Sequence, residues 1–279
     1  MYIKCWGSRG SIPVSGADYV KYGGDTTCLE IRTKSDDVII VDAGTGVRRL
    51  GNKLVKENRN TYHFLFTHAH WDHVMGLPYF KPLFLEKAKL HMHRCLYNSK
   101  YVDTIVSQVM APPHFPVEFS ELQAEILYED TNKIQFDIGS VSISSIKLSH
   151  PNGGSGFKFV ENGKVCVFLT DNDISFVHPD GLKRKDYLEF SKDADLLIHD
   201  AEYTPQEYER FTGWGHSKYT EVLELALEAG VKKLGLFHLN QERTDREMDE
   251  IVEECRQNVA VKGKNLDCFG VGCDMTFIL

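Results

Sequence analysis

Thr67-His68-Ala69-His70-Trp71-Asp72-His73 is the stretch that decides the fold. It follows an apolar run, residues 62–66, which predicts a buried strand, and it precedes residues 74–78, which predict a short helix. Metal-type side chains therefore lie where a strand of an α/β sheet ends, the usual place for a site in such sheets. One ion cannot easily use four ligands from so tight a turn, so the stretch predicts two adjacent ions. Imidazole with carboxylate suits Zn, Mn or Fe.

A surface turn rich in histidine is the alternative interpretation of this stretch. Low-complexity histidine tracts lack the fixed strand before the turn and the interleaved aspartate, so the sequence favours the metal site. The same pattern recurs along the chain, where a buried strand ends and a metal-type side chain follows. The other endings are Asp42, His150, Asp171, His199 with Asp200, and His238. So many endings in one chain indicate a dinuclear site at one edge of a sheet.

Asp42 has two roles that the sequence leaves open. It can hold a metal-bound histidine by its other ring nitrogen, or it can be an N-cap or turn residue.

The order of these residues resembles the metallo-β-lactamase-fold hydrolase superfamily over nearly the whole chain. The resemblance implies an α/β fold, a four-layer αββα sandwich of two mixed sheets with helices on the outer faces. It implies a single metallo-hydrolase domain over residues 1–279. It also implies the ligand set: His68, His70 and His150 for one ion, Asp72, His73 and His238 for the other, and Asp171 as the bridge.

Further stretches resemble the ribonuclease Z-like phosphodiesterase branch of this superfamily. They are Gly7-Ser8-Arg9-Gly10-Ser11, residues 23–27, residues 42–46, and Asp200-Ala201-Glu202 with Gly215-His216-Ser217. In that branch an acidic residue and a following His-Ser element assist protonation of the leaving oxygen. Here His216 matches, with either Asp200 or Glu202 as its partner, because the chain departs from the His-Glu-Ala-Thr of ribonuclease Z. We predict Asp72, His216, Glu202 and Asp200 as the catalytic residues.

These patterns predict a dinuclear metal-dependent hydrolase, a phosphodiesterase acting on small phosphodiesters or cyclic nucleotides through a metal-bridging hydroxide. The expected cofactors are two divalent metal ions, zinc ahead of Mn or Fe. One alternative is a lactonase or thioesterase on the same metals. Others are a di-iron redox protein, disfavoured because such relatives carry an acidic residue where His70 stands, and a non-catalytic binding protein.

Composition limits the partners and the compartment. The 279 residues carry a net charge of −8, which does not favour broad nucleic-acid binding. No long basic Gly-rich arm is visible, which argues against tRNA as substrate.

The seven cysteines include no Cys-x-x-Cys pair and indicate reduced thiols in a cytoplasmic protein. No signal peptide or apolar run long enough to span a bilayer is present, so we expect no membrane partner. The oligomeric state stays open, a homodimer included.

Three local patterns complete the prediction. Residues 110–117 hold three prolines among aromatics and predict a stiff segment, which we interpret as part of a lid or cap around residues 97–122; a plain connector is the alternative. His91 and His93 alternate as ligands would, but no nearby carboxylate joins them, so we interpret them as strand residues. Ser217 is expected to cap a helix over residues 218–229.

Overall fold

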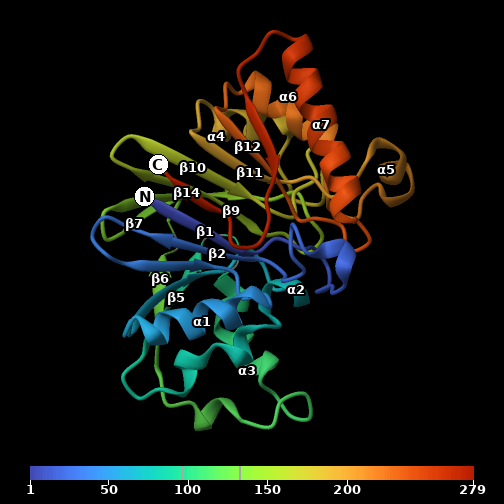
Figure 1. The fold of residues 1–279 in the computed structure, drawn as a ribbon. Coiled ribbons are helices and arrows are strands. Elements are labelled where there is room, and N and C mark those ends of the chain that lie inside the picture. The colour runs from blue at the N-terminus through green and yellow to red at the C-terminus, as the bar shows by residue number, and fades with distance from the viewer. Residues whose placement is uncertain (96, 98, 132) are drawn as a thin grey trace.

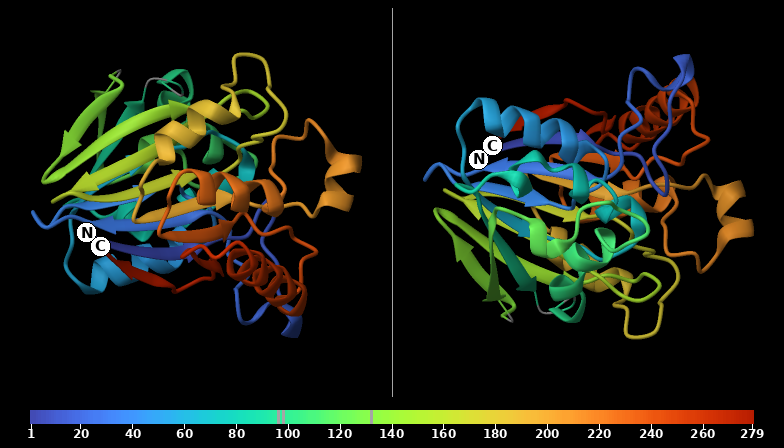
Figure 2. Two further views of the ribbon diagram at one scale, coloured as in Figure 1. Left: turned by 90° about the horizontal axis from the view of Figure 1, so that it is seen from above. Right: turned by 90° about the horizontal axis from the view of Figure 1, so that it is seen from below.

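The computed structural model describes residues 1–95, 97, 99–131 and 133–279. Within them, two seven-stranded sheets lie face to face, with helices on both outer faces (Figure 1). Figure 2 shows the helices of the C-terminal half from above and those of the N-terminal half from below. The predicted four-layer αββα sandwich of two mixed sheets is confirmed.

The first sheet has the strand order β14-β1-β2-β3-β4-β5-β6. Its strands from β14 to β3 are antiparallel, and those from β3 to β6 are parallel. Helix α1 follows β3 and helix α3 follows β5, so each crosses over between parallel neighbours. The bounds are β1 Tyr2–Gly7, β2 Cys28–Arg32, β3 Val38–Val41, β4 Thr61–Leu65, β5 Lys89–Cys95, β6 Glu125–Thr131, β14 Thr276–Ile278, α1 Gly46–Lys56, α2 Trp71–Val74 and α3 Ser99–Val109.

The second sheet has the order β13-β12-β11-β10-β9-β8-β7 and the same division into parallel and antiparallel halves. Helices α4, α6 and α7 lie over its outer face, and α5 stands apart in a loop (Figure 1). The bounds are β7 Gln135–Ile138, β8 Val141–Lys147, β9 Ser155–Glu161, β10 Lys164–Leu169, β11 Leu196–Asp200, β12 Lys233–Phe237, β13 Asp267–Gly270, α4 Arg184–Ser191, α5 Pro205–Phe211, α6 Tyr219–Glu228 and α7 Asp245–Val261.

Strand β3 shows how the sequence supplies two cores. Successive side chains of a strand point to opposite faces of the sheet. Ile39 and Val41 therefore pack between the two sheets, whereas Val38 and Ile40 pack under the helices of the first sheet. Both faces of β3 are buried, which is why its four residues are all apolar.

Three strand ends bend the chain sharply at the edge where the site lies. Asp42 after β3, Asp171 after β10 and His238 after β12 have φ angles of 61°, 49° and 57°. Such backbone conformations cost a non-glycine residue about 1–3 kcal/mol each and persist only where the surroundings impose them. All three side chains belong to the cluster described below or contact it.

The structure contradicts one local expectation, the helix cap at Ser217. Lys218, not Ser217, is the N-cap of α6, so that prediction is wrong. The Ser217 hydroxyl instead donates to the Asn172 carbonyl and accepts from the Ile174 amide at 3.2 Å. No helix among the described residues is long and apolar enough to cross a membrane.

The segment 97–122 consists of α3, an irregular stretch and a short 3₁₀ helix at Phe119–Glu121. Its Asn98 lies outside the described residues. The Phe115 ring lies edge-on to Tyr79, with centroids 5.7 Å apart, and Val117 packs against the core under the first sheet. The role of this segment as a lid stays a prediction.

Candidate metal centre

Seven side chains from both sheets meet at one edge of the sandwich. They form two groups, in each of which one potential ligand atom per residue lies within 4.8 Å of the others, and Asp171 belongs to both groups. The first group is His68, His70, His150 and Asp171, and the second is Asp72, His73, Asp171 and His238. The structure thus brings together every residue that the sequence predicted as a metal ligand, in the two sets that the resemblance implies.

Asp171 lies at the centre of the cluster. Its Oδ1 is 3.1 Å from His73 Nε2, and its Oδ2 is 3.3 Å from His238 Nε2. The same Oδ2 is 3.6 Å from Nε2 of both His68 and His150. A single carboxylate therefore reaches both groups, as a bridging ligand must.

Acceptors outside the cluster orient three of the imidazoles. When one ring nitrogen donates a proton, the other keeps its lone pair for a ligand bond. The acceptors for Nδ1 are Asp42 for His73 at 2.8 Å, Glu202 for His238 at 2.9 Å, and the Gly215 carbonyl for His150 at 2.9 Å. Asp42 therefore takes the first of the two roles that the sequence left open.

The free nitrogens fit divalent ions. Nε2 of His68 is buried and has no hydrogen-bond partner, and Nε2 of His73 lies 3.1 Å from Asp171 and 3.2 Å from Asp72 but makes no hydrogen bond to either. An unpaired buried acceptor is costly, and a ligand bond removes that cost. Imidazoles combined with carboxylates suit Zn, Mn or Fe, so the residues present fit two such ions.

The charge states of Asp171 and His150 suit metal binding. At His73 and His238, by contrast, burial is outweighed by the carboxylates around them, which raise both pKa values well above the ordinary value, so a bound ion would have to displace those protons. Burial alone would raise the pKa of Asp171, but attraction to His238, His73 and His68 outweighs it and holds that pKa well below its ordinary value. Burial lowers the pKa of His150 to about 3. The carboxylate is therefore charged and this imidazole neutral near pH 7, as metal ligands must be.

His216 lies beside the cluster and has its own carboxylate. Its Nδ1 is 2.6 Å from Asp200 Oδ2 and 3.4 Å from Glu202 Oε2, and its ring stacks on His238 with centroids 4.6 Å apart. Burial by itself lowers the pKa of His216, but the charges of Glu202 and Asp200 outweigh it and raise that pKa to about 9. The geometry makes Asp200 the partner of His216 and leaves Glu202 to His238.

The loop of residues 7–11 holds the cluster together, a role that sequence analysis did not identify. The Ser11 amide donates to Asp72 Oδ2 at 2.9 Å, and the Gly10 amide donates to the Leu239 carbonyl at 2.9 Å. A Cβ atom on Gly10 would lie 2.4 Å from the His238 ring, so only glycine fits there. The Gly-Ser-Arg-Gly-Ser motif marks this loop in the sequence. Its contacts are with distant segments of the chain, so the motif alone does not reveal its role.

Arg9 of the same loop is fully buried. Its guanidinium donates to the carbonyls of Asn240 at 2.9 Å, Arg243 at 2.9 Å and Gly23 at 3.0 Å. These bonds fix the chain that follows His238.

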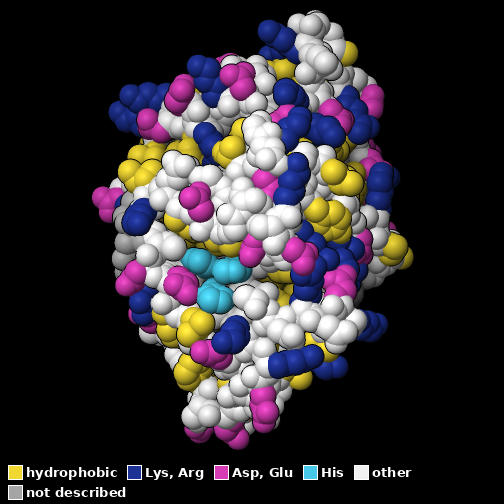
Figure 3. All heavy atoms as spheres, turned by 90° about the vertical axis from the view of Figure 1, so that its left-hand side faces the viewer, with side chains coloured by type: hydrophobic (Ala, Val, Ile, Leu, Met, Phe, Trp, Pro, Cys, Tyr) yellow, Lys and Arg dark blue, Asp and Glu magenta, His cyan; other side chains and the backbone are white. Residues whose placement is uncertain are grey.

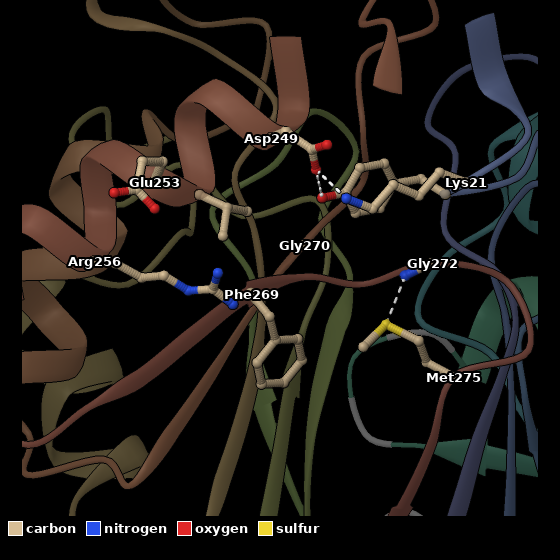
Figure 4. A pocket seen from close by; sticks show the side chains of 10 residues that line it. Lys21, Asp249, Glu253, Arg256, Phe269, Gly270, Gly272 and Met275 are labelled. Carbon is tan, nitrogen blue, oxygen red and sulfur yellow. Dashed lines mark hydrogen bonds and ion pairs between the residues drawn. The ribbon is translucent and has the colours of Figure 1, made fainter. Parts of the chain in front are cut away.

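A separate cavity of about 530 Å³ lies between α7, residues 21–22 and the connection of β13 to β14 (Figure 4). Its walls combine Phe269 and Met275 with charged side chains. Asp249 accepts from Tyr22 Oη at 2.6 Å and from Lys21 Nζ at 2.5 Å. None of the described residues lining it is a predicted site residue, so this cavity is not part of the metal centre.

Comparison with known proteins identifies the family. Residues 38–239 match the family model described as a beta-lactamase superfamily domain, which covers most of the chain. The chain belongs to the metallo-β-lactamase superfamily. The predicted metallo-β-lactamase-fold hydrolase family is thereby confirmed.

Relatives within this superfamily support the ribonuclease Z-like branch. The chain is 22% identical to a ribonuclease Z from Haloarcula marismortui, over 92% of this chain and 91% of the relative. It resembles the crystal structure of a diphosphatase from the PhnP family with a TM-score of 0.68 and 15% identity, over 100% of this chain and 97% of the other. It resembles the crystal structure of the short form of human tRNase Z with a TM-score of 0.61 and 19% identity, over 100% of this chain and 99% of the other. At such identities the structural likeness shows the fold alone.

Proposed function

We propose that this protein is a phosphodiesterase that hydrolyses small phosphodiesters with two divalent metal ions, zinc foremost. The observation that carries the proposal is the pair His216 and Asp200, 2.6 Å apart, with the His216 ring stacked on His238 of the metal cluster. Alkoxide leaving groups need a proton, whereas the metal cluster alone would serve any hydrolase of this fold.

The metal-binding part of the proposal uses the two groups of ligands described above. His68, His70 and His150 would hold one ion, Asp72, His73 and His238 the other, and Asp171 both. Two ions held there would supply Lewis acidity and a water activated near neutral pH. Asp42 and Glu202 keep the rings of His73 and His238 turned toward the cluster by accepting from their Nδ1 atoms.

His216 is the proposed general acid. Its Nδ1–H is held by Asp200, which leaves the Nε2–H to be given to the leaving oxygen of the diester. The raised pKa of His216, about 9, keeps the ring protonated near neutral pH. Asp200 itself is held by the Ser217 amide at 3.3 Å and the Glu202 amide at 3.1 Å, which fixes the carboxylate under the ring.

A cavity beside the cluster supports a small substrate. It has a volume of about 400 Å³, within the usual range for small-molecule pockets. His150 forms part of its wall together with Tyr97, Lys147, Asn152, Gly153, Pro179 and Asp180. Lys147 Nζ is 3.7 Å from Asp180, a loose pair that leaves the ammonium able to attract an anionic group. The relatives named ribonuclease Z act on RNA by their name, but a pocket of this size and a net charge of −8 favour small diesters here.

A substrate panel tests the proposal. Zinc-reconstituted protein is assayed with bis(p-nitrophenyl) phosphate, 3′,5′-cyclic nucleotides, a lactone and a thioester, with Asp171→Ala as the metal-site control. We expect turnover of the phosphodiesters, lost in the control variant. Faster turnover of the lactone or thioester than of every diester would contradict the proposal and favour the alternative hydrolases.

A further inference from the structure

Two aromatic side chains are exposed in segments that also hold the metal centre. Trp214 is 63% exposed and Phe176 is 41% exposed. Trp214 precedes His216 by two residues, and Phe176 follows Asp171 by five. At the other end of the sandwich, where both termini lie, hydrophobic side chains form small separate patches among charged ones (Figure 3). Neighbouring exposed apolar side chains, unlike scattered ones, mark surfaces that bind a ligand or a partner.

Gly215 fixes Trp214 next to a predicted metal ligand. The Gly215 carbonyl accepts from His150 Nδ1 at 2.9 Å. A Cβ atom on Gly215 would lie 2.2 Å from the same nitrogen, and its φ of 100° also favours glycine. The backbone of residue 215 therefore packs directly on the His150 ring, and the preceding residue, Trp214, lies at the margin of the metal centre.

Trp214 also belongs to a row of aromatic rings that ends at the proposed general acid. Its ring lies edge-on to Phe211, with centroids 5.3 Å apart. Phe211 stacks on Tyr203 at 5.3 Å, and Tyr203 lies edge-on to His216 at 5.8 Å. Both arrangements are favourable for aromatic pairs. The row thus holds the indole in a fixed relation to the His216 ring.

Phe176 lies beside the same loop. Its ring atoms would be 3.6 Å from a Cβ atom on Gly213, the residue before Trp214. The ring packs edge-on against the buried His178, with centroids 4.9 Å apart. The two exposed rings therefore stand on neighbouring segments, and we call Phe176 and Trp214 the aromatic rim.

The aromatic rim adjoins the cavity of about 400 Å³ proposed for the substrate. Pro179 and Asp180, which follow Phe176 in the same segment, line that cavity. His150 also lines it, and Gly215 packs on His150. Both parts of the rim are thus connected to the wall of this cavity.

The residue types of the rim indicate which chemistry it binds. Indole and phenyl rings stack on nucleobases of any identity, and each stacked base contributes about 10- to 100-fold in affinity. A net charge of −8 disfavours the alternative occupant, the surface of an anionic lipid membrane. Because the row of rings joins Trp214 to His216, the stacked base belongs to the alcohol that receives the proton, which is the leaving group.

We propose that Trp214 and Phe176 bind a nucleobase carried by the leaving group, so that nucleoside phosphodiesters are preferred to diesters without a base. The inference rests on the proposed function and adds two specificity-determining residues to it. Neither residue is a metal ligand or a proton donor. Trp214 makes the larger contribution, because indole is the larger of the two rings.

Two cyclic phosphates with the same reacting ring test the preference. Adenosine 2′,3′-cyclic phosphate carries a base, and glycerol 1,2-cyclic phosphate does not. Zinc-loaded wild type should show a kcat/KM about 10- to 100-fold higher for the adenosine compound. Trp214→Ala should lose most of this preference through a higher KM for the adenosine compound, whereas Trp214→Phe should retain most of it. Val261→Ala, which removes an exposed apolar side chain at the end of α7, should retain all of it.

A binding measurement separates this inference from the proposed function. Calorimetric titration of the zinc-loaded proteins compares AMP with ribose 5-phosphate, and thermal unfolding checks that each variant is folded. Wild type should bind AMP about 10- to 100-fold more tightly, and Trp214→Ala should bind both ligands with similar affinity. Equal affinity of wild type for both ligands, or an unchanged preference for AMP in both Trp214→Ala and Phe176→Ala, would overturn the inference. A preference for AMP that depends on Trp214, without turnover of any diester, would support base recognition by the rim and contradict the proposed function.

Discussion

Asp200 and Glu202 lie two residues apart, yet each serves a different histidine. Asp200 accepts from His216 at 2.6 Å, whereas Glu202 accepts from His238 at 2.9 Å. Strand β11 explains the division, because Asp200 is its last residue and Glu202 follows the strand beside the turn after β12.

Two matched variants test this division. Asp200→Asn should keep the metal content but lower kcat for alkyl diesters by about 10²-fold. The variant lacks the negative charge that orients the His216 ring and keeps it protonated. Bis(p-nitrophenyl) phosphate, whose leaving group needs no acid, should be less affected. Glu202→Gln should instead weaken metal affinity about 10- to 100-fold. Loss of metal affinity in Asp200→Asn, together with unchanged metal affinity and a lower kcat in Glu202→Gln, would show that the two carboxylates have the opposite roles.

Gly10 offers another test at a single residue. Gly10→Ala places a Cβ atom 2.4 Å from the His238 ring, so the ring must move. Because displacements of about 1 Å cost on the order of 10²-fold in turnover, we expect at least that loss of kcat/KM in a folded protein. Ser11→Gly is the control: it keeps the amide that Asp72 accepts from and suits the φ of 63° at that position. Full activity of Gly10→Ala would contradict the described packing.

At the scale of elements, Asp195 joins the starts of three parallel strands. Its carboxylate accepts from the Val165 amide at 2.9 Å on β10, from Lys232 Nζ at 2.8 Å before β12, and from Lys164 Nζ at 3.2 Å. Burial by itself would raise the pKa of Asp195, but these bonds outweigh it and lower the pKa to about 2.

This shift makes the stability depend on pH. A lowered pKa in the folded state stabilises the protein above the ordinary value of 3.8, and the contribution is lost as the pH falls from about 4 to about 2. Asp195→Asn should lower the free energy of unfolding by about 1 kcal/mol at pH 7, since both lysines are largely exposed and screened. Urea unfolding of both proteins at pH 7 and pH 3 should show this difference shrinking; an unchanged difference would exclude the ion pairs as its cause.

Sequence patterns predicted most elements, because apolar runs and the turn residues that bound them are local features of the sequence. The strand predicted over residues 62–66 is β4, Thr61–Leu65, and the helix predicted over residues 218–229 is α6, Tyr219–Glu228, whereas the short helix predicted over residues 74–78 lies earlier, as α2 at Trp71–Val74. The short strand β13 and helix α4 were missed. The pairing of β14 with β1, which takes the end of the chain into the first sheet, also lies outside any local pattern.

Some residues of the candidate site could likewise be predicted from local sequence, whereas others depend on contacts between distant segments. The ligands follow strand ends that the sequence displays, and parallel strands bring such ends to one edge. The partner of His216, the carboxylate of Glu129 at 2.7 Å from His91 Nδ1, the cap of α6 and the burial of Arg9 depend on such contacts. The preference for Asp200 over Glu202 is a matter of less than 1 Å, which no spacing reveals.

At the scale of the molecule, the metal centre joins the two halves of the sandwich. His68, His70, Asp72 and His73 follow β4 of the first sheet, and His150, Asp171 and His238 follow strands of the second. Bound ions should therefore stabilise both halves together.

Removing the metal should lower Tm in a single transition. Ions at 1,000 times their Kd raise the free energy of unfolding by about 4 kcal/mol, and each kcal/mol shifts Tm of a chain this size by about 2 °C or more. Calorimetry with and without a strong chelator should thus differ by about 8 °C or more. Two separate transitions, or an unchanged Tm, would contradict a centre shared by both sheets.

If these ligands and His216 make a two-metal phosphodiesterase, hydrolysis of a small phosphodiester must depend on the ions. The rate of hydrolysis is measured for metal-free protein, for the same protein reloaded with zinc, and for Asp171→Ala treated identically. We predict turnover only in the reloaded wild type. Equal turnover by the metal-free protein, or no turnover of any diester by protein shown to hold zinc at the centre, would show that this is not a two-metal phosphodiesterase.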